Sequence, residues 1–389
     1  MTTAPEQVTL LAKRVLADLD AVTERLVQAI LAADPTYGAG RTTADDLRLS
    51  CHDNLSRILG GLTNEPAPGD VFDAPHATGQ RRAQQGMPLE AVLHAYRLGH
   101  RIIWDSLVAE ARDDGSVEGL VEAASSVWEL VDTYSSEVAR AYRDTEAVLL
   151  RRDDRRKDAL IDALVEGRGR DRAVAADAAT ALDLPEHGSF VVIVLSGTST
   201  AAAADAALGV RGMRSVWRDR ADREVGLVSL GKAAPEDLLR VLEHIPGLRG
   251  GVSPVVEGLA HVDVAHRHAE TALRALALHQ TGVATLDDRL PGALLVTAPD
   301  LGNRLVQHAL GGVLALEADE RDLLLTTLAT WLATGGSASQ TATQLYCHRN
   351  TVLNRLRRVE SLTGRSAERV DDLVVWSLAL LARDLLAES

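Results

Sequence analysis

The chain of 389 residues has only two cysteines, Cys51 and Cys347, and only 3% aromatic residues. Two cysteines cannot build a disulfide framework, which predicts a protein of the reducing cytoplasm. No run of 18 uncharged apolar residues occurs, so no membrane span is expected. The N-terminus lacks the basic and apolar segments of a signal peptide. P-loop and GxGxxG motifs, which would cradle a nucleotide, are also missing.

What is present is an ordinary globular composition, with 46% apolar and 25% charged residues and a net charge of −14. The length predicts two or three domains. The acidic balance argues against the bulk surface binding nucleic acid or a membrane, but it permits one local basic patch. We expect a multidomain, mainly α protein with a helical bundle over 1–150, an α/β domain over 151–295 and an all-α domain over 296–389.

The first 150 residues show apolar residues at helical spacing throughout. One helix is expected up to Pro35, and a second from about Thr43 to Gly61. A long helix begins near Ser116 and has no stop signal before Gly167. We expect it to connect two domains or to pair between two subunits; the alternative is two helices with an unmarked break. The remaining expectations here are a loop over 63–76 and a helix that begins at Pro88.

The sequence pattern changes in the middle region, where short runs rich in β-branched residues lie between helical segments. Alternation of strands and helices is typical of an α/β or α+β domain. The expected strands are 189–196, 224–230, 249–256 and 282–286, and the expected helices are 200–218, 235–245 and 260–280.

The last third returns to helical spacing, with helices expected over 299–316, 317–334 and 371–386. Between the second and third of these lies a segment with the pattern of a helix-turn-helix. Ser337 is placed to cap a short helix that ends at Leu345, and His348 to cap a second helix. Val352, Leu356 and Val359 share one face of that second helix, at i, i+4 and i+7.

Arginine and amide side chains occupy the opposite face of the second helix, where they can pair with base edges. Residues 335–370 carry a charge of +4, so the rest of the chain sums to −18. A basic segment in an acidic protein is what phosphate contact requires. The alternative is an ordinary helical hairpin with solvated arginines. The candidate DNA-binding residues are His348, Arg349, Asn350, Thr351, Asn354, Arg355, Arg357 and Arg358.

Several elements of residues 318–385 resemble the C-terminal domain of the PucR/CdaR family of transcriptional regulators. The elements that carry the resemblance include Glu320–Leu324, Leu328–Leu332, His348–Val352 and Leu362–Gly364. The resemblance implies a Fis-like helix-turn-helix that reads double-stranded DNA, with Arg349, Asn350, Thr351 and Arg355 facing it. The chain departs from the family's pattern at Leu353-Asn354, which implies a different operator.

Two upstream regions extend the resemblance. Residues 185–290 resemble the family's GGDEF-like domain, but residues 221–225 (Ala-Asp-Arg-Glu-Val) stand at the motif position. Both glycines are replaced and Arg223 takes the place of a metal-holding acid, so no cyclase activity is expected. The segment Gly86–His100 resembles the helical domain of RsbR-type stress-signalling proteins.

A small-molecule effector site is a further expectation for the N-terminal helices. Seven of the twelve aromatic residues lie before residue 150, and polar residues accompany them on one helix. The candidate residues are Tyr96, Arg97, His100 and Trp104. The alternative is that these aromatics only pack the bundle.

No catalytic residue, metal or cofactor is expected. His261, Asp263, His266 and His268 are interpreted as a solvated helix face rather than a metal site, and Cys347 as a buried core thiol rather than a redox switch. The sequence therefore predicts a homodimeric or higher homo-oligomeric DNA-binding transcriptional regulator, without membrane contact, that responds to a small-molecule or protein signal. The rival hypotheses are a protein-interaction scaffold of the stress-signalling kind and a nucleotide cyclase.

Overall fold

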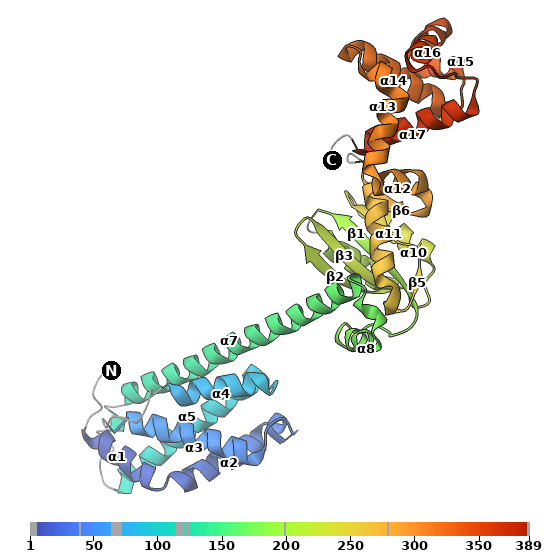
Figure 1. Ribbon diagram of the computed structural model, residues 1–389. Coiled ribbons are helices and arrows are strands. Elements are labelled where there is room, and N and C mark those ends of the chain that lie inside the picture. The colour runs from blue at the N-terminus through green and yellow to red at the C-terminus, as the bar shows by residue number, and fades with distance from the viewer. Residues whose placement is uncertain are drawn as a thin grey trace. The chain divides into compact units, whose positions relative to one another are not determined.

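The computed structural model describes residues 6–38, 40–63, 72–113, 120–121, 124–197, 200–277 and 280–386. It divides into two compact units, residues 1–155 and 156–389 (Figure 1). The expected fold class is confirmed: the chain is mainly helical with a small mixed sheet in its middle region. None of the described helices is long and apolar enough to cross a membrane.

The first unit is a bundle of helices around one apolar core. Leucine, valine and isoleucine side chains from the first three helices meet Ile103 and Leu107 of α5 and Tyr134 and Val138 of α7. The elements are α1 (Glu6–Ala17), α2 (Leu19–Ala33), the 3₁₀ turn η1 (Pro35–Gly38), α3 (Ala44–Gly61), α4 (Asp73–Gln84), α5 (Leu89–Asp113) and the first part of α7 (Ala124–Val165).

Two expectations for this unit are wrong. The single helix expected up to Pro35 is divided at Asp18, whose backbone leaves the helical region, and aspartate is among the weaker helix formers. The loop expected over 63–76 ends early, because α4 already begins at Asp73. Pro75 lies in the first turn of α4, where no intrahelical N–H bond is lost. Residues 64–71 of that expected loop lie outside the described residues.

The long connecting helix is observed as α7, which is continuous from Ala124 to Val165 across the division between the two units. Its expected beginning near Ser116 lies outside the described residues. The expected end at Gly167 is confirmed, since this glycine takes a positive φ of 88° just after the helix. The expected domain boundaries at 150 and 295 remain predictions.

A mixed sheet organises the first half of the second unit. Its strand order is β2-β3-β1-β4-β6, with β5 beside β1. The central strand β1 (Ser189–Ser196) pairs antiparallel with β3 (Arg223–Ser229), β4 (Arg249–Val252) and β5 (Val256–Glu257). The outer strand β2 (Arg214–Arg220) is antiparallel to β3, and β6 (Gly282–Thr285) is parallel to β4.

Both faces of β1 are covered by helices, which explains its uninterrupted apolar sequence. Phe190, Val192 and Val194 pack on one face with α8 (Arg172–Ala181) and α11 (Val262–Arg274). Val191, Ile193 and Leu195 pack on the other face with α9 (Ala201–Val210) and α10 (Pro235–Glu243).

The sheet corrects two further expectations. The helix expected over 200–218 ends at Val210, and Arg214–Arg220 forms β2 instead. This edge strand is rich in charged residues and lacks alternating apolar residues. The local sequence pattern therefore does not predict its pairing with β3. The strand expected over 249–256 is interrupted at Ser253-Pro254, because proline has no N–H to donate to a ladder.

The C-terminal part is all helical and has its own core, which includes Trp331, Leu356 and Trp376. Gly312 lies against the main chain of Leu362, so the helices that contain these two residues, α13 and α16, pack closely. Its helices are α12 (Leu290–Thr297), α13 (Pro299–Leu314), α14 (Ala318–Ala333), α15 (Ala338–Gln344), α16 (Arg349–Thr363) and α17 (Val370–Leu386). The three helices expected here are confirmed, whereas α12 was not expected.

Candidate functional site

The helix-turn-helix is formed by α15 and α16 as the sequence predicts. The Ser337 side chain accepts a hydrogen bond from the Gln340 N–H at 3.3 Å and begins α15. The His348 ring accepts from the Asn350 N–H through Nδ1 at 3.2 Å, which requires the tautomer with the proton on Nε2. Gly364, with a φ of 68°, ends α16.

One face of α16 is fixed in the core and the other is free. Val352, Leu356 and Val359 are at most 4% exposed. His348, Arg349 and Asn350, together with Asn354, Arg357 and Arg358, are exposed, while Thr351 is half-buried. A helix held by its apolar face presents its polar side chains in a fixed order, which is the geometry of a recognition helix.

The arginines of this segment differ in what they contact. Arg355 is half-buried and donates to the hydroxyl of Thr327 on α14 at 3.3 Å. Arg358 lies 3.3 Å from Glu320, also on α14. Arg365 and Arg369 both pair with Asp372, at 2.9 and 3.8 Å. Most of the local positive charge counted in the sequence therefore has a partner in the fold.

Arg349 and Arg357 are the arginines left at the exposed face. Arg357 donates to the Asn354 side chain at 2.9 Å, which orients both residues side by side. Arg349 has no ion pair with the described residues. Two guanidinium groups and two amides on one helical face supply bidentate donors of the kind that base edges accept.

Tyr346 is a residue that sequence reasoning missed. It lies in the turn between α15 and α16, is 98% exposed and has a positive φ of 51°. An exposed large aromatic residue in this conformation costs free energy in the folded chain. Its only signal in the sequence is its place between two apolar turn residues, Leu345 and Cys347.

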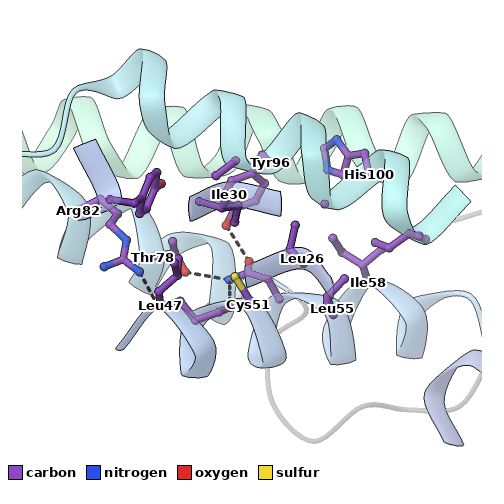
Figure 2. Close-up of a pocket in the computed structure, with 16 residues that line it drawn as sticks. Leu26, Ile30, Leu47, Cys51, Leu55, Ile58, Thr78, Arg82, Tyr96 and His100 are labelled. Atoms are coloured by element: carbon purple, nitrogen blue, oxygen red, sulfur yellow. Dashed lines mark hydrogen bonds between the residues drawn. The ribbon is translucent and has the colours of Figure 1, made fainter. Parts of the chain in front are cut away.

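The N-terminal unit contains a cavity of about 50 Å³ between α2, α3, α4 and α5 (Figure 2). Two of the candidate effector residues, Tyr96 and His100, line it, whereas Arg97 and Trp104 do not. The Tyr96 hydroxyl donates to the Asn54 side chain at 2.7 Å. The buried Nε2 of His100 has no hydrogen-bond partner among the residues that the structure describes, and burial lowers the pKa of His100 to about 4.

A buried arginine closes one end of this cavity. Arg82 is 1% exposed, forms an ion pair with Asp46 and donates to Ser50 at 3.1 Å and to Gln85 at 2.7 Å. Burial alone would raise the pKa of Asp46, but hydrogen bonds from Gln85, Arg81 and Arg82 outweigh it and hold this pKa at about 2.

The interpretation of His261, Asp263, His266 and His268 as a solvated helix face needs one correction. Asp263 is 5% exposed and is therefore not part of a solvated face. It pairs with Arg170 at 2.9 Å and with Arg267 at 3.1 Å, and the first of these partners comes from a distant segment. Among the described residues no group of three His, Cys, Asp or Glu side chains is placed to hold a metal ion.

The arrangement defines a class of protein: a helical domain and a GGDEF-like sheet domain followed by a helix-turn-helix. Family models agree. The "RsbT co-antagonist protein rsbRD N-terminal domain" matches residues 20–157, the "GGDEF-like domain" 166–275 and the "PucR C-terminal helix-turn-helix domain" 324–382. The resemblance to the PucR/CdaR family, with the same order of three domains, is thus confirmed.

Three relatives are similar over part of their length. The chain is 39% identical over 74 residues to the Purine catabolism regulatory protein of Bacillus subtilis, which is 19% of this chain and 14% of that protein. It is 33% identical over 119 residues to the uncharacterized protein YsfB of Bacillus subtilis, 31% of each. An uncharacterized protein in the pkwA 5' region of Thermomonospora curvata is 34% identical over 121 residues, 31% of this chain and 66% of that protein. The chain therefore spans less than two thirds of each.

Among solved structures, that of a Regulator of Polyketide Synthase Expression from Bifidobacterium adolescentis is similar. The comparison covers 58% of this chain and 97% of the other, with 23% identity and a TM-score of 0.31. A score this low supports no argument about the arrangement of the domains.

Proposed function

We propose that this protein is a transcriptional regulator that binds specific DNA sequences through α16 and acts as a dimer. The observation that carries the proposal is the exposed face of α16, where Arg349, Asn350, Asn354 and Arg357 stand on a helix whose other side is anchored in the core. The PucR-type domain match and the regulatory relative from Bacillus subtilis support the same function.

The acidic charge of the whole chain fits this assignment. Residues outside 335–370 sum to −18 and repel the phosphate backbone, which restricts contact to the helix-turn-helix. Tyr346, exposed beside the N-terminus of α16, is placed to contact the backbone or a thymine methyl group. We infer that it adds to the contacts made by Arg349 and Asn350.

Selection of bound duplexes from a random DNA pool tests the proposal without knowledge of the operator. We expect enrichment of two half-sites whose centres are about one helical turn apart, because one recognition helix contacts few base pairs. Arg349→Ala and Asn350→Ala should each weaken binding to the selected duplex by about 1–3 kcal/mol, or roughly 5- to 150-fold, without unfolding the protein. Binding should also weaken steeply as salt rises from about 50 to 200 mM.

Arg304→Ala is the matched control, since Arg304 is an exposed arginine of the same domain on α13. It should bind the selected duplex as the unchanged protein does. Unchanged binding by the Arg349 and Asn350 variants would refute the residue assignment. A pool with no enriched sequence would favour the protein-interaction scaffold instead, and a single uninterrupted half-site would argue against the dimer.

We infer further that the N-terminal unit receives the signal, through a small effector in the cavity beside Tyr96 and His100. The unpaired Nε2 of buried His100 offers one hydrogen bond, and a volume of about 50 Å³ admits only a ligand of a few atoms. A thermal-shift screen of small metabolites tests this, with Gly99→Ala as a variant that narrows the cavity. A compound that stabilises both proteins equally does not bind there.

A further inference from the structure

The second unit contains a larger pocket where the sheet meets the C-terminal helix. Its volume is about 330 Å³, within the range of small-molecule sites. The end of β1, the beginnings of β3 and β4 and the end of α11 form one side. Leu385 and Leu386 of α17 and Val296 of α12 form the other.

Three arginines line this pocket, and for two of them the described residues provide no acidic partner. Arg249 donates to the main-chain oxygen of Leu276 at 2.7 Å, and Arg274 to that of Val296 at 2.6 Å. Among the described residues neither guanidinium forms an ion pair with a carboxylate. Each is therefore tethered by one N–H and keeps its other donors, and the buried Nε of Arg249 has no hydrogen-bond partner in the described part of the chain.

The third arginine, Arg223, is already neutralised. It lies 3.0 Å from Glu270 and 3.6 Å from Asp222. Its charge still acts on its neighbour: burial and the Arg223 guanidinium both lower the pKa of Arg249. The pocket thus holds two guanidinium groups that have no carboxylate partner among the described residues, and a bound anion would compensate their charge.

Arg223 also stands where the GGDEF motif places an acid. In a cyclase that acid holds a magnesium ion, and the ion in turn meets phosphate groups. An arginine at this position removes the metal ligand and supplies a cation directly. The replacement therefore removes a metal ligand from this edge of the sheet.

We propose that this pocket binds a small organic molecule through a phosphate group held by Arg249 and Arg274. A phosphate monoester carries a charge of about −1.5 to −2 near pH 7, which matches two unpaired guanidinium groups, and arginine pairs with phosphate in a bidentate manner. The apolar side chains of Leu385, Leu386 and Val296 cover the body of the ligand. The proposal does not depend on DNA binding.

Isothermal titration calorimetry of the full chain tests the proposal, with adenosine monophosphate, inorganic phosphate and succinate at one ionic strength. We expect adenosine monophosphate to bind more tightly than succinate, a dicarboxylate of the same charge. Arg249→Gln and Arg274→Gln should each weaken its binding at least tenfold. Arg211→Gln, which removes an exposed arginine outside the pocket, should leave it unchanged.

The variants Arg249→Lys and Arg274→Lys distinguish a loss of binding from a loss of folding. They keep the positive charge and lose only the planar guanidinium group. They should bind more weakly than the unchanged protein and more tightly than the glutamine variants. No binding of adenosine monophosphate, tighter binding of succinate, or equal binding by the Arg249→Gln/Arg274→Gln double variant would overturn the proposal. All of these readouts are taken without DNA, so they stand apart from any failure of the proposed regulator function.

Discussion

Single buried residues carry the most unusual chemistry of the N-terminal unit. Arg82 and Asp46 are 36 positions apart in the chain and form an ion pair, with Arg82 buried and Asp46 half-buried, that several hydrogen bonds complete. His100 is the opposite case, a buried ring whose Nε2 has no partner within the described segments. A buried charged pair needs full hydrogen bonding to be stable, whereas a buried histidine avoids the cost by staying neutral.

The lowered pKa of His100 makes the stability of the N-terminal unit depend on pH. Burial lowers this pKa from 6.5 to about 4, so the unfolded chain takes up a proton first as the pH falls. The contribution to the free energy of unfolding is therefore complete above about pH 6.5 and is lost toward pH 4. The loss is about 2 kcal/mol between pH 7 and 5, and about 3 kcal/mol in full.

His100→Gln should remove this part of the pH dependence, measured as the urea dependence of hydrogen exchange in α5 at pH 7 and pH 5. The other cavity groups with shifted pKa values do not titrate in this range, since burial raises the pKa values of Tyr37 and Cys51 to about 12. His52→Gln, at a histidine whose side chain is 42% exposed, serves as the control. An unaltered pH dependence in His100→Gln would contradict the prediction.

At the scale of elements, the position of α16 depends on α13, which packs closely against it. The C-terminal core joins α13, α14 and α17 to the buried face of α16. The position of α16 is set by how closely α13 approaches it, and Gly312 makes that approach possible. A Cβ at this position would lie 2.1 Å from the main-chain oxygen of Leu362.

Two adjacent glycines of α13 should therefore respond in opposite ways to alanine. Gly312→Ala forces the backbones of α13 and α16 apart and should destabilise the domain by about 3 kcal/mol. Gly311→Ala meets only the Gln307 side chain at 3.9 Å and should stabilise it by up to about 1 kcal/mol, because alanine is the better helix former. Urea unfolding followed by circular dichroism and by tryptophan fluorescence measures both. Equal effects of the two substitutions would mean that the close approach is not required.

At the scale of the whole molecule, α7 is the continuous helix that links the two units. Its middle part has exposed apolar residues, with Val148 at 57%, Leu149 at 37% and Leu150 at 62% exposure. A helix segment without a packed face is marginally stable in water, and an exposed apolar group of this kind indicates an interaction surface. We therefore place the proposed dimer contact on this part of α7.

The double variant Val148→Glu/Leu150→Glu should shift the protein from dimer to monomer in light scattering. Its affinity for a duplex with two half-sites should fall toward that for a single half-site, since two recognition helices would no longer bind together. Arg152→Glu, at an exposed position of the same segment, should leave the dimer intact. A dimer of undiminished stability in the double variant would place the contact elsewhere.

The sequence by itself determined the features that local pattern controls. Spacing of apolar residues is enough for long helices and for the buried strand β1, and cap residues define α15 and α16. The resemblance to the PucR/CdaR family came from the residues around His348. For the same reason the candidate DNA-binding residues could be proposed before the fold was known, because a recognition helix is contiguous in the chain.

Only the tertiary structure decided what depends on distant partners. It showed that Arg355, Arg358 and Arg365 contact Thr327, Glu320 and Asp372, partners that lie far from them in the sequence or beyond the next turn. It revealed the charged edge strand β2, which has no apolar pattern of its own and exists because β3 pairs with it. It also brought Arg249 and Arg274 to one pocket and Tyr96 and His100 to another. Burial, pairing and cavities arise from contacts between distant segments, and a linear pattern does not contain those contacts.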